Sequence, residues 1–253
     1  MAKLTKKELS LHNEALDILE KDKLTDDERW FVLENWRPSA GDVTDGNAYF
    51  TPMSVAQSVA IETIDQGHLL DLCAGTGRLS LHVYLRARNV HWEDKIQITA
   101  VESNPDFVEV GRKVLPMVNW ICDDIFRKDM WKGKRFTAVI SNPPFGNSKR
   151  VDWLGYSGPM SLMALEIALR VSDAGATFVL PKGYAEYAHT RNGYKKQEPA
   201  HYMRKFLDMF GVEMSTSAFP TSDGSFSDTG IETEIISFAS DEPMYIPFQE
   251  TLW

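Results

Sequence analysis

The chain has 253 residues, 43 % of them hydrophobic, which predicts a globular protein built around one sizeable core. No apolar run approaches the about 18 residues of a membrane span and no apolar signal core follows the lysine-rich start, so we expect a soluble, cytoplasmic protein. The net charge of −9 excludes a surface that is basic throughout, so any contact with nucleic acid has to be a local patch.

The N-terminal residues, 1–40, predict a helical extension of two helices. The first would carry leucines at helical spacing, and the second would begin at the capping box Thr25-x-x-Glu28. The segment RPSAGDVTDGN that follows is rich in Pro, Gly and Asp and ends this pattern. We therefore treat residues 41–253 as one further domain.

From Tyr49 onward, helical and strand-like segments alternate along the chain. This alternation is typical of an α/β fold with a mostly parallel sheet and helices on both faces. We expect seven strands, near residues 67–73, 97–102, 117–122, 136–141, 175–180, 212–218 and 232–238. We expect helices between them, near residues 53–65, 77–88, 105–115, 160–171 and 199–210.

The cysteines and histidines give no sign of a metal centre. Cys73 and Cys122 are too far apart for a metal knuckle and too few for a disulfide framework, so we expect reduced thiols in the core. The six histidines include no close pair with ligand spacing. We therefore expect no metal.

The first strand-to-helix turn, LLDLCAGTGRLS, combines Asp71 with the glycines Gly75 and Gly77. The glycines permit a tight turn close to a ligand, and the helix that follows presents free N–H groups. A dinucleotide site would have the longer pattern G-x-G-x-x-G, and Asp71 would repel a pyrophosphate. The turn therefore favours a cationic ligand with an ammonium and a sulfonium, although a tight turn without a ligand would use the same glycines.

Two further acidic residues occupy similar positions, since Glu102 ends the second predicted strand and Asp124 follows the third. The carboxyl ends of parallel strands meet at one edge of the sheet, where ligands bind. A carboxylate there can accept both hydroxyls of a ribose, and a second can accept an adenine amino group. Three acids at successive strand ends therefore indicate a ligand site rather than solvated turns.

The fourth predicted strand ends in the segment VISNPPFGNS. Prolines cannot donate to a β-ladder, so the strand has to end at Asn142 with its last side chains facing open space. A carboxamide, an exposed carbonyl and an aromatic ring then meet at one strand end. A turn that only terminates the strand is the alternative explanation.

In this order, the segment DLCAGTG, Glu102, Asp124 and the segment NPPF resemble the S-adenosylmethionine-dependent amino-methyltransferases, most closely the N6-adenine DNA methyltransferases. The resemblance implies a Rossmann-like class I methyltransferase domain with S-adenosylmethionine as its cofactor. NAYFTPMSVAQSVA is similar to the aromatic-x-Thr-Pro segment that covers the methionine end of the cofactor in that family. GATFVLPKG and FSDTGIETEIISF look like late strands of type I modification subunits, so the resemblance covers roughly residues 47–239.

The resemblance also implies roles for individual residues. In the family, the asparagine oxygen and the first proline carbonyl accept hydrogen bonds from the target amine, and the aromatic ring stacks on the flipped-out base. The implied catalytic residues are Asn142, Pro143, Pro144 and Phe145. The implied cofactor-binding residues are Tyr49, Thr51, Pro52, Asp71, Ala74, Gly75, Gly77, Glu102, Ser103, Asp124, Ile125 and Asn142. Tyr49 and Phe50 would otherwise be ordinary core aromatics.

A separate target-recognition domain is usual in the family, and too few residues follow Phe145 to provide one here. We therefore expect loops at the strand ends to contact DNA. The segment 182–205 carries six Lys or Arg against two Glu, with four interleaved tyrosines, which suits a nucleic-acid groove. A solvated basic loop is the alternative. The expected nucleic-acid-binding residues are Lys149, Arg150, Arg191, Tyr194, Lys195 and Lys196.

The leading hypothesis is a solitary modification enzyme that methylates N6 of adenine in DNA, with a short or degenerate target. The same Asn-Pro-Pro-aromatic motif occurs in methyltransferases that act on RNA bases or on a protein glutamine, but the aromatic-x-Thr-Pro segment favours DNA. A non-catalytic cofactor-binding or anti-restriction protein is the third hypothesis, and the intact Asn142, Asp71 and Glu102 weigh against it. A long target sequence would require a recognition element in the helical extension or in a partner subunit.

Overall fold

A computed structural model describes residues 4–38, 50–145, 150–154, 156–185, 198–219, 221 and 232–240 of the chain. The helices in these ranges are α1 (Lys6–Leu19), α2 (Asp26–Asn35), α3 (Met53–Glu62), α4 (Arg78–Asn89), α5 (Pro105–Val114), the short 3₁₀ helix η1 (Lys128–Trp131), α6 (Met160–Val171) and α8 (Glu198–Phe210). The strands are β1 (Gly67–Leu72), β2 (Ile96–Glu102), β3 (Asn119–Cys122), β4 (Phe136–Ser141), β5 (Arg150–Trp153), β6 (Tyr156–Pro159), β7 (Ser172–Pro181), β8 (Glu213–Thr216) and β9 (Thr233–Ala239).

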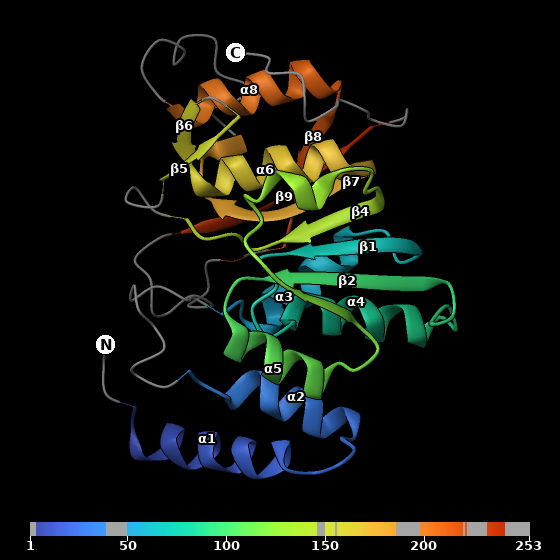
Figure 1. Ribbon diagram of the computed structural model, residues 1–253, viewed down its shortest axis with the longest axis vertical. Coiled ribbons are helices and arrows are strands. Elements are labelled where there is room, and N and C mark those ends of the chain that lie inside the picture. The colour runs from blue at the N-terminus through green and yellow to red at the C-terminus, as the bar shows by residue number, and fades with distance from the viewer. Residues whose placement is uncertain are drawn as a thin grey trace.

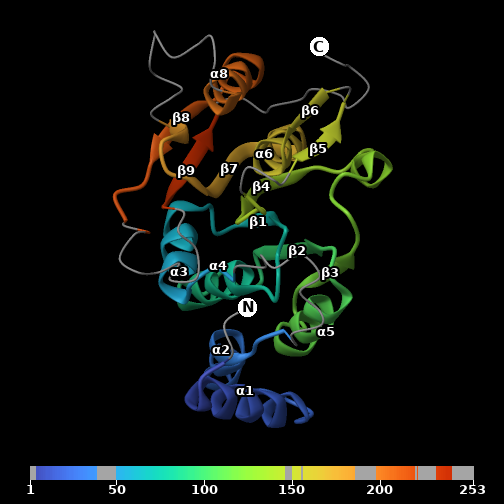
Figure 2. The same cartoon turned by 90° about the vertical axis from the view of Figure 1, so that its left-hand side faces the viewer.

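Seven of these strands form one sheet in the order β3-β2-β1-β4-β7-β9-β8 (Figures 1 and 2). All neighbours pair in parallel except β9, which is antiparallel to both β7 and β8. The chain runs outward from β1 to β3 and then returns to β4 on the other side of β1. In open parallel sheets, ligands bind beyond the strand ends at such a reversal. The expected mostly parallel, seven-stranded α/β sheet is therefore confirmed.

Neighbouring residues of the central strands pack on opposite faces of the sheet. Leu69 and Ile140 belong to the core cluster that includes α3, α4 and α5, whereas Leu70 and Val139 belong to the cluster that includes α6 and α8. This alternation follows from the two-residue period of a β-strand. Figures 1 and 2 show these helices divided between the two sides of the sheet. Because helices cover both faces, a ligand site is expected at the edge where the strands end.

The N-terminal helices pack against the sheet's own helices (Figures 1 and 2). Each begins with a capping box, and the second is the expected pair of Thr25 and Glu28. Asp26 pairs with Arg88 of α4 at 2.5 Å, and the Trp30 ring meets His82 of α4 at a centroid distance of 4.8 Å. Burial lowers the pKa of His82 to about 4, so this imidazole is neutral at pH 7.

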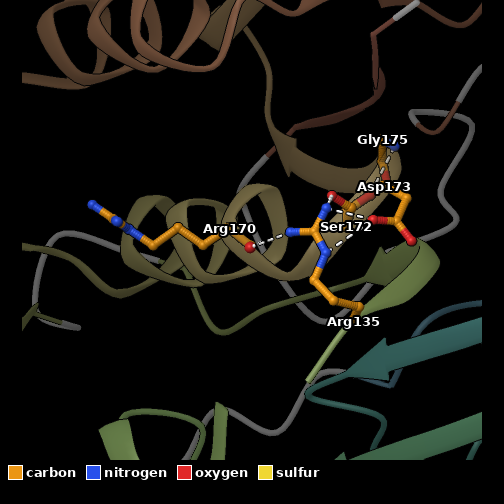
Figure 3. A network of polar contacts seen from close by, with 5 residues as sticks. All are labelled: Arg135, Arg170, Ser172, Asp173 and Gly175. Carbon is orange, nitrogen blue, oxygen red and sulfur yellow. Dashed lines mark hydrogen bonds and ion pairs between the residues drawn. The ribbon is translucent and has the colours of Figure 1, made fainter. Parts of the chain in front are cut away.

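Arg135 stabilises the direct transition from α6 into β7 (Figure 3). Its guanidinium donates to the carbonyls of Arg170, at 2.9 Å, and Ser172, at 3.0 Å, and it pairs with the carboxylate of Asp173. The last carbonyls of a helix otherwise lack intrahelical donors. The Ser172 hydroxyl also accepts from the Gly175 amide at 2.7 Å. These bonds fix the start of β7 beside β4, the strand that leads to the NPPF segment.

The predicted helices and sheet strands all form within a few residues of their expected bounds. The hairpin of β5 and β6 and the short helix η1 are not predicted, because neither has a hydrophobic period long enough to be recognised. The expectation for Cys122 is wrong in part: both cysteines are free thiols, but Cys122 is exposed because β3 is an edge strand, and Cys73 is half-buried.

Two further features are absent from the described ranges. No helix there is both long and apolar enough to cross a bilayer. No three His, Cys, Asp or Glu side chains of those residues gather in a way that could hold a metal ion.

Candidate active site

The candidate site lies where β1, β2, β3 and β4 end at one edge of the sheet. Asp71 pairs in register with Ile140, and Leu72 pairs with Ser141, so the glycine turn and the NPPF segment leave adjacent strands at the same level. The Ser141 hydroxyl also donates to the Leu72 carbonyl. This edge is the topological reversal of the sheet, where a ligand is expected.

The glycine turn has a backbone that only glycine adopts without strain at two positions. Gly75 has φ +57° and Gly77 has φ +95°, both in the left-handed region. A Cβ at Gly77 would lie 2.7 Å from Cδ1 of Leu115, so this position also has no space for a side chain. Ala74 is buried beneath the turn, and its amide donates to the Val101 carbonyl at 3.0 Å. The turn is therefore tied to β2 and to α5.

Asp71 is fully buried, and one oxygen of its carboxylate is fixed by the start of α4. Oδ2 accepts from the Ser80 hydroxyl at 2.6 Å and from the Ser80 amide at 3.1 Å. Oδ1 is buried and has no hydrogen-bond partner among the described residues. A buried acceptor without a partner is costly, so this oxygen is suited to a donor that a ligand brings.

Burial raises the pKa of Asp71 to about 7, and the two bonds from Ser80 only partly oppose this rise. A ligand ammonium near Oδ1 would favour the ionised form and release a proton on binding. Below pH 7 the free protein binds that proton, so if Oδ1 accepts from the ammonium of S-adenosylmethionine, as the resemblance implies, affinity for this cofactor should fall by up to about tenfold per pH unit as the pH is lowered toward 5.5.

This pH dependence can be measured by titration calorimetry between pH 5.5 and 7.5, below the range in which a free α-amino group loses its proton, near pH 8. The control is Asp71→Asn, which keeps an acceptor for Ser80 and cannot ionise. Its affinity should be flat over the same range. If the affinity of both proteins depended equally on pH, Asp71 would not be the titrating group.

Glu102 is the last residue of β2, and its carboxylate binds the backbone of the glycine turn. Its Oε2 accepts from the Gly75 amide at 2.9 Å, and its Oε1 accepts from the Asn104 amide at 2.9 Å and from the Ser103 hydroxyl at 3.3 Å. The carboxylate thus lies between the turn after β1 and the turn after β2. Each oxygen keeps further lone-pair capacity, which a pair of ribose hydroxyls can use.

Asp124 and Ile125 follow β3 and differ in exposure. Asp124 is exposed, and its Oδ1 accepts from the Phe126 amide at 2.9 Å, which shapes the turn. Ile125 is buried, and its carbonyl accepts from the Trp131 ring nitrogen at 2.7 Å. Phe126 also meets Trp153 of the unpredicted hairpin, with ring centroids 5.7 Å apart. The hairpin that follows the NPPF segment therefore packs on the end of β3.

Asn142 has a fixed carboxamide with one free acceptor. Its Nδ2 donates to the hydroxyl of Thr51 at 2.9 Å, and its Oδ1 is buried without a partner among the described residues. Pro143 and Phe145 are buried, whereas Pro144 is exposed. Phe145 is only 7 % exposed, so its ring has to be uncovered before it can stack on a base.

The structure describes three of the remaining predicted site residues, Thr51, Pro52 and Arg150. Thr51 is buried. Pro52 directly precedes α3, and the Pro52 carbonyl accepts from the Ala56 amide at 2.9 Å. Arg150 is exposed on β5, and its guanidinium donates to the Ser157 carbonyl at 2.8 Å. Outside the described residues lie Tyr49, Lys149, Arg191, Tyr194, Lys195 and Lys196.

Two residues at the site were missed by the sequence analysis, Ser80 and Arg78. Ser80 lies in the first turn of α4, and a small hydroxyl residue early in a helix is a signal that could have been used. Arg78 follows the glycine turn directly and donates to the Thr51 carbonyl at 2.8 Å. Nothing in the local sequence indicates that partner, which is 27 residues away.

Most elements of the candidate site lie within a stretch of the chain that matches a known family. The family model named Methyltransferase small domain matches residues 55–154, the stretch that contains the glycine turn, Glu102 and the NPPF segment. The fold is that of a class I methyltransferase. This match and fold support an S-adenosylmethionine-dependent methyltransferase, and the free oxygen of Asp71 and the carboxylate of Glu102 fit that cofactor's amine and ribose. No curated protein matches the chain.

Three solved structures illustrate the fold. A type I restriction-modification methyltransferase subunit from Streptococcus thermophilus has a TM-score of 0.62 and 18 % identity over 86 % of this chain and 49 % of its own. The M protein of the type I restriction enzyme EcoKI has a TM-score of 0.57 and 14 % identity over 93 % and 55 %. A putative class I methyltransferase from Listeria monocytogenes has a TM-score of 0.53 and 13 % identity over 97 % and 72 %. The chain spans about half the length of the two type I subunits.

Proposed function

We propose that this protein transfers a methyl group from S-adenosylmethionine to N6 of adenine in DNA. The observation that carries the proposal is the carboxamide of Asn142, whose nitrogen is bound by Thr51 and whose buried oxygen has no partner among the described residues. An oxygen in that state is suited to accept a hydrogen bond from a substrate amine, because binding then satisfies a polar group that is otherwise left unpaired.

The chemistry of an aromatic amine explains why such an acceptor is needed. The lone pair of an exocyclic amine is delocalised into the ring, so the nitrogen is a weak nucleophile. Acceptors on its hydrogens favour a pyramidal nitrogen whose lone pair can attack. Asn142 would supply one acceptor and the carbonyl of Pro143 the other, both of them preorganised at the end of β4. S-adenosylmethionine would supply the methyl group and leave as S-adenosylhomocysteine, and the methylated nitrogen would then lose one proton to solvent.

We assign the cofactor to the carboxyl ends of β1, β2 and β3. Asp71 would accept from the ammonium through Oδ1, while Ser80 holds Oδ2. Glu102 would accept from the ribose hydroxyls, and Asp124 from the adenine amino group. The glycine turn, with Ala74 and Ser103 beside it and Ile125 after β3, would form the walls, and the segment from Tyr49 to Pro52 would cover the methionine end.

DNA is the proposed substrate because two of the similar structures are type I restriction-modification methyltransferases and because the aromatic-x-Thr-Pro segment precedes the glycine turn. The proposed contacts to the phosphates are Lys149, Arg150, Arg191, Lys195 and Lys196, with Tyr194 stacking on a base. Phosphate contacts carry no sequence information, so we expect a short or degenerate target. A flipped-out adenine would require Phe145 to turn outward.

The test is transfer of an isotope-labelled methyl group to duplex DNA, single-stranded DNA, RNA and cell protein in separate reactions. The products are digested and identified by mass spectrometry. We expect label in N6-methyladenine from DNA, and a rate of labelling lower by about 10²-fold or more when the Asn142→Ala variant is used. Label only in an RNA base or only in a protein glutamine would overturn the DNA proposal. Binding of the cofactor without methyl transfer to any substrate would overturn the proposal that the protein is an enzyme.

A further inference from the structure

Arg78 is buried at the start of α4, between the glycine turn and the N-terminal helices. The residue is 8 % exposed. Its Nη1 donates to the Thr51 carbonyl at 2.8 Å, and its Nη2 reaches the Glu34 carbonyl at the end of α2 at 3.4 Å. The guanidinium carbon lies 5.1 Å from the centre of the Phe50 ring. Arg78 thus contacts the aromatic-x-Thr-Pro segment twice.

This burial is costly for a cation. Among the described residues, no carboxylate forms an ion pair with Arg78, and its Nε is buried without a partner. Burial lowers the pKa of Arg78 to about 9, which reflects the loss of water around the guanidinium. The buried Arg170 on α6, in contrast, pairs with Glu166 at 2.7 Å. An apolar side chain could fill the same space without this loss of hydration, so what distinguishes an arginine here is its donors to the Thr51 and Glu34 carbonyls.

Thr51 connects Arg78 to the proposed catalytic turn. Its carbonyl accepts from Arg78, and its hydroxyl accepts from Nδ2 of Asn142 at 2.9 Å. The carboxamide of Asn142 could otherwise rotate and present its nitrogen, a donor, to the substrate amine. The Thr51 hydroxyl fixes the position of the carboxamide, its bond to Nδ2 leaves Oδ1 as the free acceptor, and Arg78 holds the backbone from which that hydroxyl extends.

We propose that Arg78 is a positioning residue for methyl transfer, acting through Thr51 on the carboxamide of Asn142. The proposal rests on the function assigned to Asn142 above. It also makes the N-terminal helices part of the catalytic unit, because α2 supplies the Glu34 carbonyl and packs Trp36 against Phe50 at a centroid distance of 6.1 Å.

The first test measures kcat and cofactor affinity for Arg78→Met, which keeps the stem and removes every donor. We expect kcat to fall by about tenfold, the effect of one net hydrogen bond, with the cofactor Kd within about twofold of wild type. Arg78→Lys should recover part of kcat because an ammonium can still donate to the Thr51 carbonyl. The control is Arg86→Met on the same helix, since Arg86 donates to the Ile61 and Thr63 carbonyls, away from the site. It should lower Tm and leave kcat unchanged.

The second test separates the path through Thr51 from a general loss of structure. Thr51→Val removes the hydroxyl and keeps the backbone carbonyl, whereas Thr51→Ser keeps both. Thr51→Val should lower kcat about as much as Arg78→Met, and the double variant should be no worse than the poorer single variant. Thr51→Ser should stay close to wild type. Multiplicative losses in the double variant would overturn the proposal, as would an Arg78→Met protein with normal kcat.

A readout that needs no substrate distinguishes this proposal from the proposed function. In ¹⁵N-resolved NMR spectra, the side-chain amide signal of Asn142 is identified by its absence from Asn142→Ala. It should shift or broaden in Arg78→Met and in Thr51→Val but not in Arg86→Met. If the natural substrate is RNA or a protein, this result still holds and only the substrate is revised. An unchanged signal in both variants would show that Arg78 does not position Asn142, even if the protein methylates DNA.

Discussion

Asn142→Ala is expected to lower turnover by about 10²-fold or more, the scale of one lost preorganised catalytic hydrogen bond. The reason is local: Oδ1 of Asn142 is buried without a partner among the described residues, and Thr51 holds the nitrogen away from the substrate side. Cofactor affinity should change little, since the carboxylates of β1 and β2 remain. Steady-state methyl transfer and titration calorimetry on the same preparation measure the two quantities.

Asn119→Ala is the matched control for this variant. Asn119 is an exposed asparagine at the start of β3, where its Nδ2 donates to the Thr99 hydroxyl at 3.3 Å, far along the strands from the site edge. It should keep normal turnover. An Asn142→Ala protein with turnover near that of wild type would show that the NPPF segment serves only to end β4.

Glu102→Ala should weaken S-adenosylmethionine binding by about 1.5–3 kcal/mol, the range for hydrogen bonds to a charged group, or roughly 10- to 150-fold in Kd. Its carboxylate holds the Gly75 and Asn104 amides at 2.9 Å each, so the variant loses both a ligand acceptor and the closure of the glycine turn. Calorimetry with S-adenosylmethionine and with S-adenosylhomocysteine should give equal losses, because a ribose contact does not depend on the sulfonium charge.

The matched control is Glu109→Ala, which removes an exposed carboxylate from α5 without touching the site. It should bind the cofactor as wild type does. Glu102→Gln keeps the shape and one acceptor, so its loss should lie between those of wild type and Glu102→Ala. If Glu102→Ala bound the cofactor normally, the ribose would have to be held elsewhere.

The sequence by itself predicted the helices and strands of the main sheet and the edge at which a ligand would bind, but not the β5–β6 hairpin or η1. Strand and helix positions follow from hydrophobic periods of two and 3.6 residues, which are local properties of the chain. The left-handed turn at Gly75 and Gly77 and the end of β4 before Pro143 are also local, because glycine and proline restrict the backbone where they stand. The parallel α/β class then brings the carboxyl ends of the strands to one edge.

Only the tertiary structure decided which atoms meet at that edge. The pairing of Asn142 with Thr51 spans 91 residues, and that of Arg78 with Thr51 spans 27. The first depends on the order of strands in the sheet and the second on how α3 packs against α4, neither of which a local period encodes. Burial also depends on the tertiary structure. The sequence indicates that Asp71 is an acidic ligand residue, but only the fold shows that Ser80 binds one carboxylate oxygen and leaves the other without a partner among the described residues. Full burial also raises the pKa of Asp71. Desolvation depends on everything packed around a group, so it appears only when the chain has folded.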